Sequence, residues 1–136
     1  MDRLTLVRGI FSADRYATEL TGIEITSLGT NEAVCTLTVD ERHRNARGAV
    51  MGGALFTLAD FATAVAANSS EIQKTDTELH WVSLDASVHY LSPAVGNKLT
   101  ARSTAIKHGR TTALYQTAID CDGRTVAMVE TTMVRI

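Results

Sequence analysis

One apolar segment, Ala49–Ala67, constrains the fold of this chain most strongly, because it contains a single charged residue, Asp60. Apolar side chains recur in it at helical spacing, and two phenylalanines make its other faces apolar as well. Gly52 and Gly53 open the predicted helix, and Asn68, Ser69 and Ser70 close it. A membrane-spanning helix needs about 20 strongly apolar residues, whereas this segment is rich in Ala, Gly and Thr. We therefore expect a helix buried inside a folded domain.

The composition fits one domain with an aliphatic core, spanning residues 1–136. The chain is 45% hydrophobic and 5% aromatic. Its formal charge of −2 argues against nucleic-acid binding, which depends on clustered Lys and Arg. Cys35 and Cys121 cannot build a disulfide framework or a four-ligand zinc site, so we expect both in or near the core and predict no metal and no cofactor. The first residues lack a signal-peptide pattern, so we expect a cytoplasmic location without a membrane partner.

The remaining sequence predicts strands around the helix. Residues 1–22 form an N-terminal segment with a short helix over 12–20, which Ser12 would cap and Gly22 would follow. Two extended stretches lie within 23–39, and a polar loop follows over 40–48. Period-two alternation and turn residues predict further strands over 82–90, 99–106, 112–119 and 125–134, with Asp122-Gly123 as a hairpin turn. The result is an α+β fold with one helix on an antiparallel sheet of five to six strands.

Asp60 is the residue that needs an explanation. An ionised carboxylate in an apolar helix costs several kcal/mol unless it is paired or solvated. No Lys or Arg lies three or four residues away on either side. Its partner must come from elsewhere in the fold, from a ligand, or from water in a cleft. Asp60 is therefore either a functional carboxylate or a structural one, placed at a subunit interface or bonded to neighbouring backbone.

Gly52 and Gly53 supply a second feature at the start of the helix. Their backbone N–H groups are open to close approach, and the helix dipole favours negative charge there. Asp60 lies about 12 Å further along by helical rise, a gap that a bound ester or thioester could partly span. Tight packing of the helix on the sheet is the alternative reason for two glycines.

The stretch His43–Asp60 resembles the signature of hotdog-fold acyl-CoA thioesterases of the phenylacetate-pathway (PaaI-like) type. That signature has an Asn, a Gly and a Gly-Gly pair at fixed spacing, then an Asp seven residues later. The matching residues are Asn45, Gly48, Gly52, Gly53 and Asp60. Residues 83–94 and 107–111 resemble the family's second strand with its Ser-Pro-Ala turn and its Gly-Arg/Lys-Thr turn. The resemblance covers residues 12–136 and implies a hotdog fold, with one long buried helix wrapped by an antiparallel sheet.

The resemblance also implies hydrolysis of an acyl-CoA thioester to a free carboxylic acid and CoA. Asp60 would attack the thioester carbonyl or activate a water, and the Gly52 N–H would be the oxyanion donor. Asn45 would position the carbonyl or the water, and Ser83 matches a position where some members hold water. In the family the two halves of each site come from different subunits, so Asp60 would face an interfacial cleft.

Met51 departs from the family, which usually has His before the two glycines. A thioether cannot donate the hydrogen bond that an imidazole donates, so any orienting role of that His is lost. The backbone donor and the carboxylate both remain. Met51 and Gly53 are still expected to lie against the substrate.

Coenzyme A is polyanionic, and a basic turn is suited to its phosphates. The residues that we expect there are Lys107, His108, Gly109, Arg110 and Thr111. A second basic group, Arg42, Arg44 and Arg47, is better explained as solvated surface.

Two other functions remain open, an acyl-CoA binding or sensing module without catalysis and a structural interaction domain. The helix is apolar on all sides, so one sheet cannot cover all the apolar surface. We therefore predict a homodimer that assembles to a homotetramer. The acyl group is undetermined. Four aromatic residues could line an aromatic-acyl pocket or simply belong to the core: Phe56, Phe61, Trp81 and Tyr90.

Overall fold

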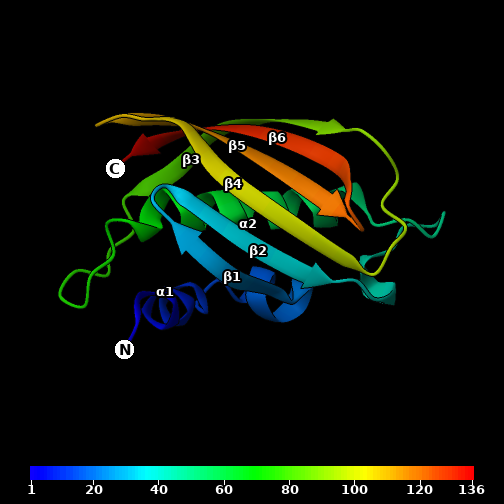
Figure 1. The fold of residues 1–136 in the computed structure, drawn as a ribbon, viewed down its shortest axis with the longest axis horizontal. Helices are drawn as coiled ribbons and strands as arrows, with labels where there is room; N and C mark the ends of the chain where they lie inside the picture. The colour runs from blue at the N-terminus through cyan, green and yellow to red at the C-terminus, as the bar shows by residue number, and fades with distance from the viewer.

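The computed structural model describes all residues, 1–136, and shows a six-stranded antiparallel sheet curled around one long helix (Figure 1). The strands are β1 (Ile23–Gly29), β2 (Glu32–Thr38), β3 (Trp81–Tyr90), β4 (Lys98–His108), β5 (Thr112–Cys121) and β6 (Arg124–Arg135). Their order across the sheet is β1-β2-β4-β5-β6-β3, so β1 and β3 form its two edges. The predicted α+β hotdog arrangement is confirmed, with six strands.

The helix α2 (Gly52–Ser69) begins and ends where the sequence predicts. It packs on every strand of the sheet, and Leu58, Ala62 and Val65 have no exposed surface. Asp60 is the one exposed residue between Ala54 and Ser69. Beyond its first turn, the helix is thus buried or half-buried at every position except Asp60.

The loops that position these elements follow local sequence signals. Asp122 and Gly123 both have positive φ, 51° and 83°, as a two-residue hairpin turn that matches the strand twist requires. The polar loop after β2 contains a short 3-10 helix, η2 (Glu41–His43), capped by the Asp40 side chain. Both cysteines are buried, as predicted. Burial raises the pKa of the Cys35 thiol to about 12, which makes it unreactive.

The prediction for the N-terminal segment is wrong in detail. Helix α1 spans Arg3–Phe11, a single turn of π-helix, η1, spans Tyr16–Thr21, and Ser12 ends α1 instead of starting a helix. Asp2 is the residue that caps α1, because its carboxylate accepts a 2.7 Å hydrogen bond from the Thr5 N–H. Gly22, with φ of 91°, ends η1 in the left-handed region as expected. No helix of the chain is long and apolar enough to cross a membrane.

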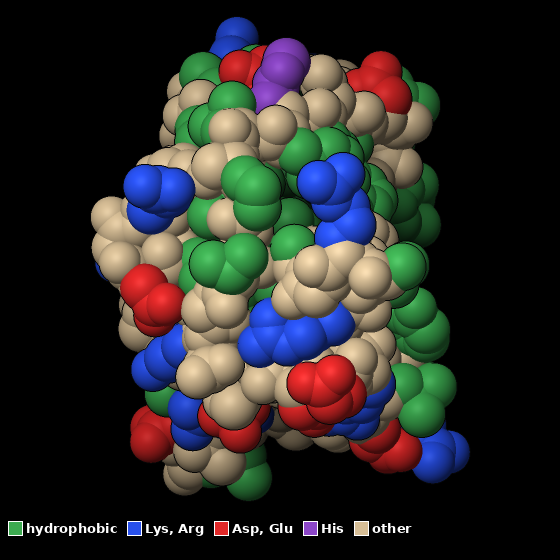
Figure 2. All heavy atoms as spheres, turned by 90° about the vertical axis from the view of Figure 1, so that its right-hand side faces the viewer, with side chains coloured by type: hydrophobic (Ala, Val, Ile, Leu, Met, Phe, Trp, Pro, Cys, Tyr) green, Lys and Arg blue, Asp and Glu red, His purple; other side chains and the backbone are tan.

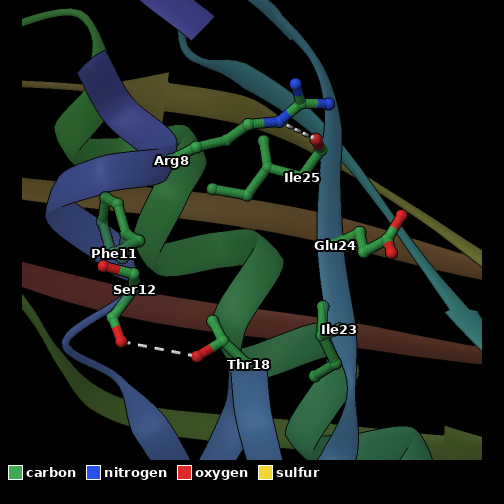
Figure 3. A pocket seen from close by; sticks show the side chains of 7 residues that line it. All are labelled: Arg8, Phe11, Ser12, Thr18, Ile23, Glu24 and Ile25. Carbon is green, nitrogen blue, oxygen red and sulfur yellow. Dashed lines mark hydrogen bonds between the residues drawn. The ribbon is translucent and has the colours of Figure 1, made fainter. Parts of the chain in front are cut away.

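The N-terminal segment covers the β1 edge of the sheet. Arg8 Nε donates a 2.8 Å hydrogen bond to the carbonyl of Ile25, on the open side of β1. Figure 3 shows the pocket of about 420 Å³ between α1, η1 and β1, with Phe11 and Ile23 at its apolar wall. The other edge strand, β3, has no such cover.

Candidate active site

Asp60 lines a small cavity between α2 and the N-terminal segment. The cavity has a volume of about 290 Å³. Its walls combine apolar and polar groups, namely Asp14, Arg15, Tyr16, Ala17, Thr57, Phe61 and Ala64. Phe61 is fixed in place by an edge-to-face contact with Phe11, with ring centroids 5.7 Å apart. Asp60 therefore lines this cavity next to the ring of Phe61, which packs in the core.

The surroundings of Asp60 favour its protonated form. The protein around the side chain partly withdraws it from water, which raises the pKa of the carboxyl, and the negative charge of Asp14 raises this pKa further. A hydrogen bond from the Ser83 hydroxyl acts in the opposite direction and lowers the pKa. The net result is a pKa above the ordinary value for Asp. Such a carboxylate is a stronger base than a solvated one.

Ser83, on β3, lowers the pKa of Asp60, so these two predicted site residues lie near one another. The pairing register between β3 and β6 shifts between Ser83 and Asp85. This irregularity is a β-bulge, a feature that bends a strand and re-aims a side chain. The groups that act on the pKa of Asp60 from outside its own helix are therefore Asp14 in the N-terminal segment and Ser83 on an edge strand.

Gly52 and Asn45 line a different and larger cavity at the start of α2. It has a volume of about 620 Å³, and Leu55 and Tyr90 also line it. The N–H groups of Gly52 and Gly53 have no acceptor within the chain, whereas Ala54 and Leu55 donate to the Met51 carbonyl. A Cβ atom at position 52 would lie 3.2 Å from the Tyr90 ring, a close approach that favours glycine.

Asn45 uses its carboxamide oxygen to hold its own loop. Oδ1 accepts hydrogen bonds from the N–H groups of Arg47 (2.9 Å) and Ala49 (3.2 Å). Asn45 is exposed, and its Nδ2 group stays available to a ligand. Met51 is 48% exposed and makes no side-chain cap on α2, so the start of the helix is open to solvent.

Figure 2 shows this end of the molecule, with hydrophobic side chains gathered at its centre and separate Lys and Arg side chains around them. Part of that basic surface is tied to the loop. Arg44 donates to the Gly48 carbonyl and to Asn97, and Arg42 donates to Asp40 and to the Leu20 carbonyl. These contacts agree with a structural role for Arg42 and Arg44, whereas Arg47 lines the cavity at the start of α2.

The turn over residues 107–111 lies at the opposite end of α2. The His108 ring packs against Trp81 at a tilt of 55°, with ring centroids 4.5 Å apart, and Trp81 is hydrogen-bonded to Asn68 in the last turn of the helix. Lys107 and Arg110 are exposed and form no ion pair. His108 differs, because its Nδ1 is 2.7 Å from the Tyr115 hydroxyl and burial lowers the pKa of its ring. The positive charge of this turn therefore comes from Lys107 and Arg110.

A polar cluster around Trp81 escaped the sequence analysis. The Trp81 indole donates a 2.6 Å hydrogen bond to Glu71, which also pairs with Arg135. Burial raises the pKa of Glu71, but these two donors outweigh it and leave that pKa below the ordinary value. Asn68 holds the Trp81 backbone. A buried Asn in an apolar helix was the one signal available, since the other members come from distant parts of the chain.

The connection between α2 and β3 brings three possible metal ligands, Asp76, Glu78 and His80, within 4.8 Å of one another. The two acids are exposed, and the Asp76 carboxylate already accepts a hydrogen bond from the Glu78 N–H. This arrangement is a local turn in a surface loop.

Comparisons with known proteins agree on one family. Residues 47–132 match the Thioesterase superfamily. The chain is 28% identical over 116 residues to acyl-coenzyme A thioesterase 13 of Homo sapiens, covering 85% of this chain and 78% of that protein. It is 33% identical over 99 residues to the acyl-coenzyme A thioesterase PaaI of Escherichia coli, covering 72% of this chain and 66% of that protein.

Solved structures show the same likeness over nearly the whole chain. The E. coli PaaI structure superposes with a TM-score of 0.81 at 27% identity, covering 99% of this chain and 96% of that one. A hypothetical thioesterase from Streptococcus pneumoniae, solved with coenzyme A, gives a TM-score of 0.78 at 25% identity, covering 93% and 96%.

Proposed function

The chain belongs to the Thioesterase superfamily and is a PaaI-like enzyme that hydrolyses thioesters, and from this premise we propose how its own residues hydrolyse an acyl-CoA. Asp60 acts as the general base or nucleophile on the thioester carbonyl. The Gly52 N–H stabilises the negative charge that develops on the carbonyl oxygen, and Asn45 and Ser83 position the carbonyl or the attacking water. The proposal rests mainly on the environment of Asp60. This residue is the one exposed position between Ala54 and Ser69, it lines a cavity, and the pKa of its carboxyl is raised.

The start of α2 supports the oxyanion role of Gly52. Two adjacent N–H groups, those of Gly52 and Gly53, point out of the helix without an acceptor, and the helix dipole favours negative charge at this place. Met51, unlike an imidazole, adds no donor. Polarisation of the thioester carbonyl then depends on the backbone N–H groups alone. The reaction type stays the same, but a histidine makes no contribution to it.

We propose that the active unit is at least a dimer. A base and an oxyanion donor must both lie within hydrogen-bond reach of one thioester, yet Asp60 and Gly52 line separate cavities and lie about 12 Å apart along the helix. One chain alone therefore does not form the complete site. A second copy, with its α2 antiparallel to the first, would bring its Gly52 end toward Asp60.

The β3 edge is where such a second copy would join. From Val82 to Tyr90 every residue of β3 is exposed except the half-buried Val88, and Leu84 is 64% exposed. A long, apolar, unpaired edge strand is a template for pairing with another chain. Two-fold pairing of identical edges closes a dimer without leaving an edge free. Association of two such dimers would give the expected homotetramer.

We propose that the 107–111 turn holds the phosphates of coenzyme A. Lys107 and Arg110 are exposed cations without a carboxylate partner, held in place by the contact of His108 with Trp81. Gly109 donates to the Thr112 carbonyl at 2.9 Å and closes the turn. Coenzyme A enters as part of the substrate, and the chemistry proposed here uses no other cofactor.

Thiol release from a panel of acyl-CoA substrates tests this function. We expect turnover with at least one acyl group, and we expect Asp60→Asn to reduce kcat by about 10²–10⁴-fold while the protein stays folded. Glu41→Gln is a matched control, because the Glu41 side chain is 98% exposed and remote from Asp60. Binding without turnover in the unaltered protein would support a sensing module instead. Full turnover by folded Asp60→Asn would exclude the role of Asp60.

A further inference from the structure

Tyr90 is an exposed aromatic residue that the mechanism above does not use. It is the last residue of β3, and it is 55% exposed. Its hydroxyl donates a 3.2 Å hydrogen bond to the carbonyl of Gly52, in the first turn of α2. Of the four aromatic residues that could line an acyl pocket, it is the one that lines the cavity at the start of this helix. Tyr90 therefore links the edge strand to the proposed oxyanion donor.

The Tyr90 ring also lies close against the Gly52 backbone. A Cβ atom at position 52 would lie 3.2 Å from Cζ, 3.3 Å from the hydroxyl oxygen and 3.4 Å from Cε1 of Tyr90. The phenol can approach the helix this closely because residue 52 has no side chain. The glycine and the tyrosine thus fit together as a pair.

The backbone on both sides of the Tyr90 side chain is fixed by β6. Tyr90 pairs with Ala127, which has no exposed surface. The N–H groups of Leu91 and Ser92 both donate to the Val126 carbonyl, at 2.8 and 3.3 Å. The phenol therefore extends from a well-anchored point of the sheet, although the side chain itself is more than half exposed.

Two backbone hydrogen bonds also hold the start of α2. The Val50 N–H donates to the Ala94 carbonyl at 2.9 Å. The Met51 N–H donates to the His43 carbonyl at 2.8 Å. Both bonds fix residues that precede the helix. The Tyr90 contact differs from them, because a side chain makes it and because it reaches a peptide group inside the first turn.

The Gly52 carbonyl and the Gly53 N–H belong to one planar peptide group. A hydrogen bond donated to the carbonyl of such a group polarises the group and strengthens its N–H as a donor. The Gly53 N–H has no acceptor within the chain, and it points out of the helix N-terminus, where the helix dipole favours negative charge. The Tyr90 hydroxyl thus acts on a peptide group whose N–H is free to contact a substrate.

We propose that Tyr90 is a positioning residue, whose hydroxyl holds and polarises the Gly52–Gly53 peptide group so that the Gly53 N–H acts as a second oxyanion donor beside that of Gly52. This inference rests on the proposed role of the Gly52 N–H. It makes the end of β3 part of the reaction. Because Met51 supplies no donor, the oxyanion would be stabilised by these two backbone groups.

A role of the Tyr90 ring in holding the acyl group is the alternative, since Tyr90 lines the cavity together with Leu55. The two roles depend on different parts of the side chain. A phenylalanine at this position keeps the ring and loses the hydroxyl. It would preserve a contact between the ring and the acyl group, but it would remove the hydrogen bond to Gly52.

The first measurement is the steady-state kinetics of Tyr90→Phe with the best substrate of the acyl-CoA panel. We expect kcat to fall about tenfold with little change in KM, because the lost interaction strengthens as negative charge develops in the transition state. Loss of a whole oxyanion donor costs about 10²–10³-fold, and here both N–H groups remain. A ring that only holds the acyl group would leave kcat and KM of Tyr90→Phe at their wild-type values.

Thr26→Val is the matched control for the loss of a hydroxyl that bonds to a backbone carbonyl. The Thr26 hydroxyl donates to the Val34 carbonyl at 3.0 Å, between β1 and β2, and Thr26 lines neither cavity of the candidate site. Both variants should lower the Tm slightly. Only Tyr90→Phe should lower kcat.

Infrared spectroscopy of the bound thioester gives a readout that a purely structural role would not change. The best substrate, labelled with ¹³C at its thioester carbonyl, is bound to folded Asp60→Asn, which turns it over slowly. Donors that contact the carbonyl oxygen polarise the bond and lower its stretching frequency, so we expect a downshift from the value of free acyl-CoA. The downshift should be smaller when Tyr90→Phe is added to Asp60→Asn, and unchanged when Thr26→Val is added instead.

The outcomes separate this inference from the proposed function. Wild-type kcat in Tyr90→Phe, or a downshift that Tyr90→Phe leaves unchanged, would overturn the role of Tyr90 while leaving the Gly52 donor in place. No downshift in Asp60→Asn itself would overturn the oxyanion role of Gly52, and the inference with it. Wild-type turnover by folded Asp60→Asn would overturn the role of Asp60 alone, and the kinetics of Tyr90→Phe would still decide the role of Tyr90.

Discussion

The two edges of the sheet are treated in opposite ways. At β1 the N-terminal segment lies over the strand, and Arg8 donates a hydrogen bond to the Ile25 carbonyl on its open side. At β3 only the first residue is occupied, by the Asn68 side chain, and the strand beyond it is exposed. Exposed edges are a hazard that proteins usually cover. This contrast fits our proposal that β3 pairs with a second copy of the chain.

The largest effect is expected from damage to the bare edge. Leu84→Arg places a charge in the middle of β3, which opposes pairing of two copies. We expect a monomer by light scattering and a loss of thioesterase activity of about 10²-fold or more, because the two halves of the site separate. Glu24→Arg is the control on β1, where residue 24 is also exposed. It should keep both assembly and activity, and an active Leu84→Arg monomer would refute the shared site.

A second effect concerns the basic turn beside the first residue of the bare edge. Arg110→Ala removes an exposed cation that we assign to a coenzyme phosphate. We expect KM for acyl-CoA to rise about tenfold at low salt, the equivalent of about 1.4 kcal/mol, and less at high salt. Arg124→Ala, at the other end of the sheet, should leave KM unchanged. Equal KM values for Arg110→Ala and Arg124→Ala would show that the 107–111 turn does not bind coenzyme A.

A smaller effect is expected at the covered edge. Arg8→Ala removes the hydrogen bond to the Ile25 carbonyl and should lower the free energy of unfolding by about 1 kcal/mol. Denaturant titration measures it. We expect the oligomeric state and kcat to stay the same, since the proposed dimer does not use this edge. A change of oligomeric state would mean that Arg8 protects β1 from pairing as well.

The smallest effect links the covered edge to Asp60. Burial and then the charge of Asp14 raise the pKa of Asp60, so Asp14→Asn should lower that pKa. The acid limb of the pH–rate profile then moves to lower pH, with the plateau at higher pH unchanged, because Asp60 is ionised there in both proteins. Glu19→Gln, in the same segment, should leave the limb in place. A shift to higher pH would contradict the placement of Asp14.

Sequence patterns predicted those elements whose signal is local. The limits of α2, the Asp122-Gly123 turn and the five-to-six-stranded antiparallel sheet were predictable from apolar period and turn residues. The helix α1 was missed because it is only nine residues long and contains Gly9, and only its Val7 and Phe11 are buried. Its stability comes from contact with the sheet and from the Asp2 cap, and the first of these is a tertiary interaction.

The candidate site was predictable only as a set of separate parts. The resemblance to the thioesterase family predicted four site residues: Asp60, Gly52, Asn45 and Ser83. Their spacing along the chain does not show which of them lie close together in the fold. Asp60 faces Ser83 and Asp14, whereas Gly52 and Asn45 line another cavity. Their roles in catalysis remain predictions. Asn68 could have been noticed as an amide in an apolar helix, but its partner is a backbone group on another strand.

The sequence by itself determined the fold class, the length of the buried helix and the presence of one carboxylate within it, because apolar periodicity and the cost of burying a charge are local properties. Tertiary structure alone decided what surrounds that carboxylate and which edge of the sheet stays open. Both depend on contacts between residues far apart in the chain, such as Asn68 with Trp81 and Arg8 with Ile25. Such contacts depend on how the sheet curves around the helix, and local sequence patterns do not predict that curvature.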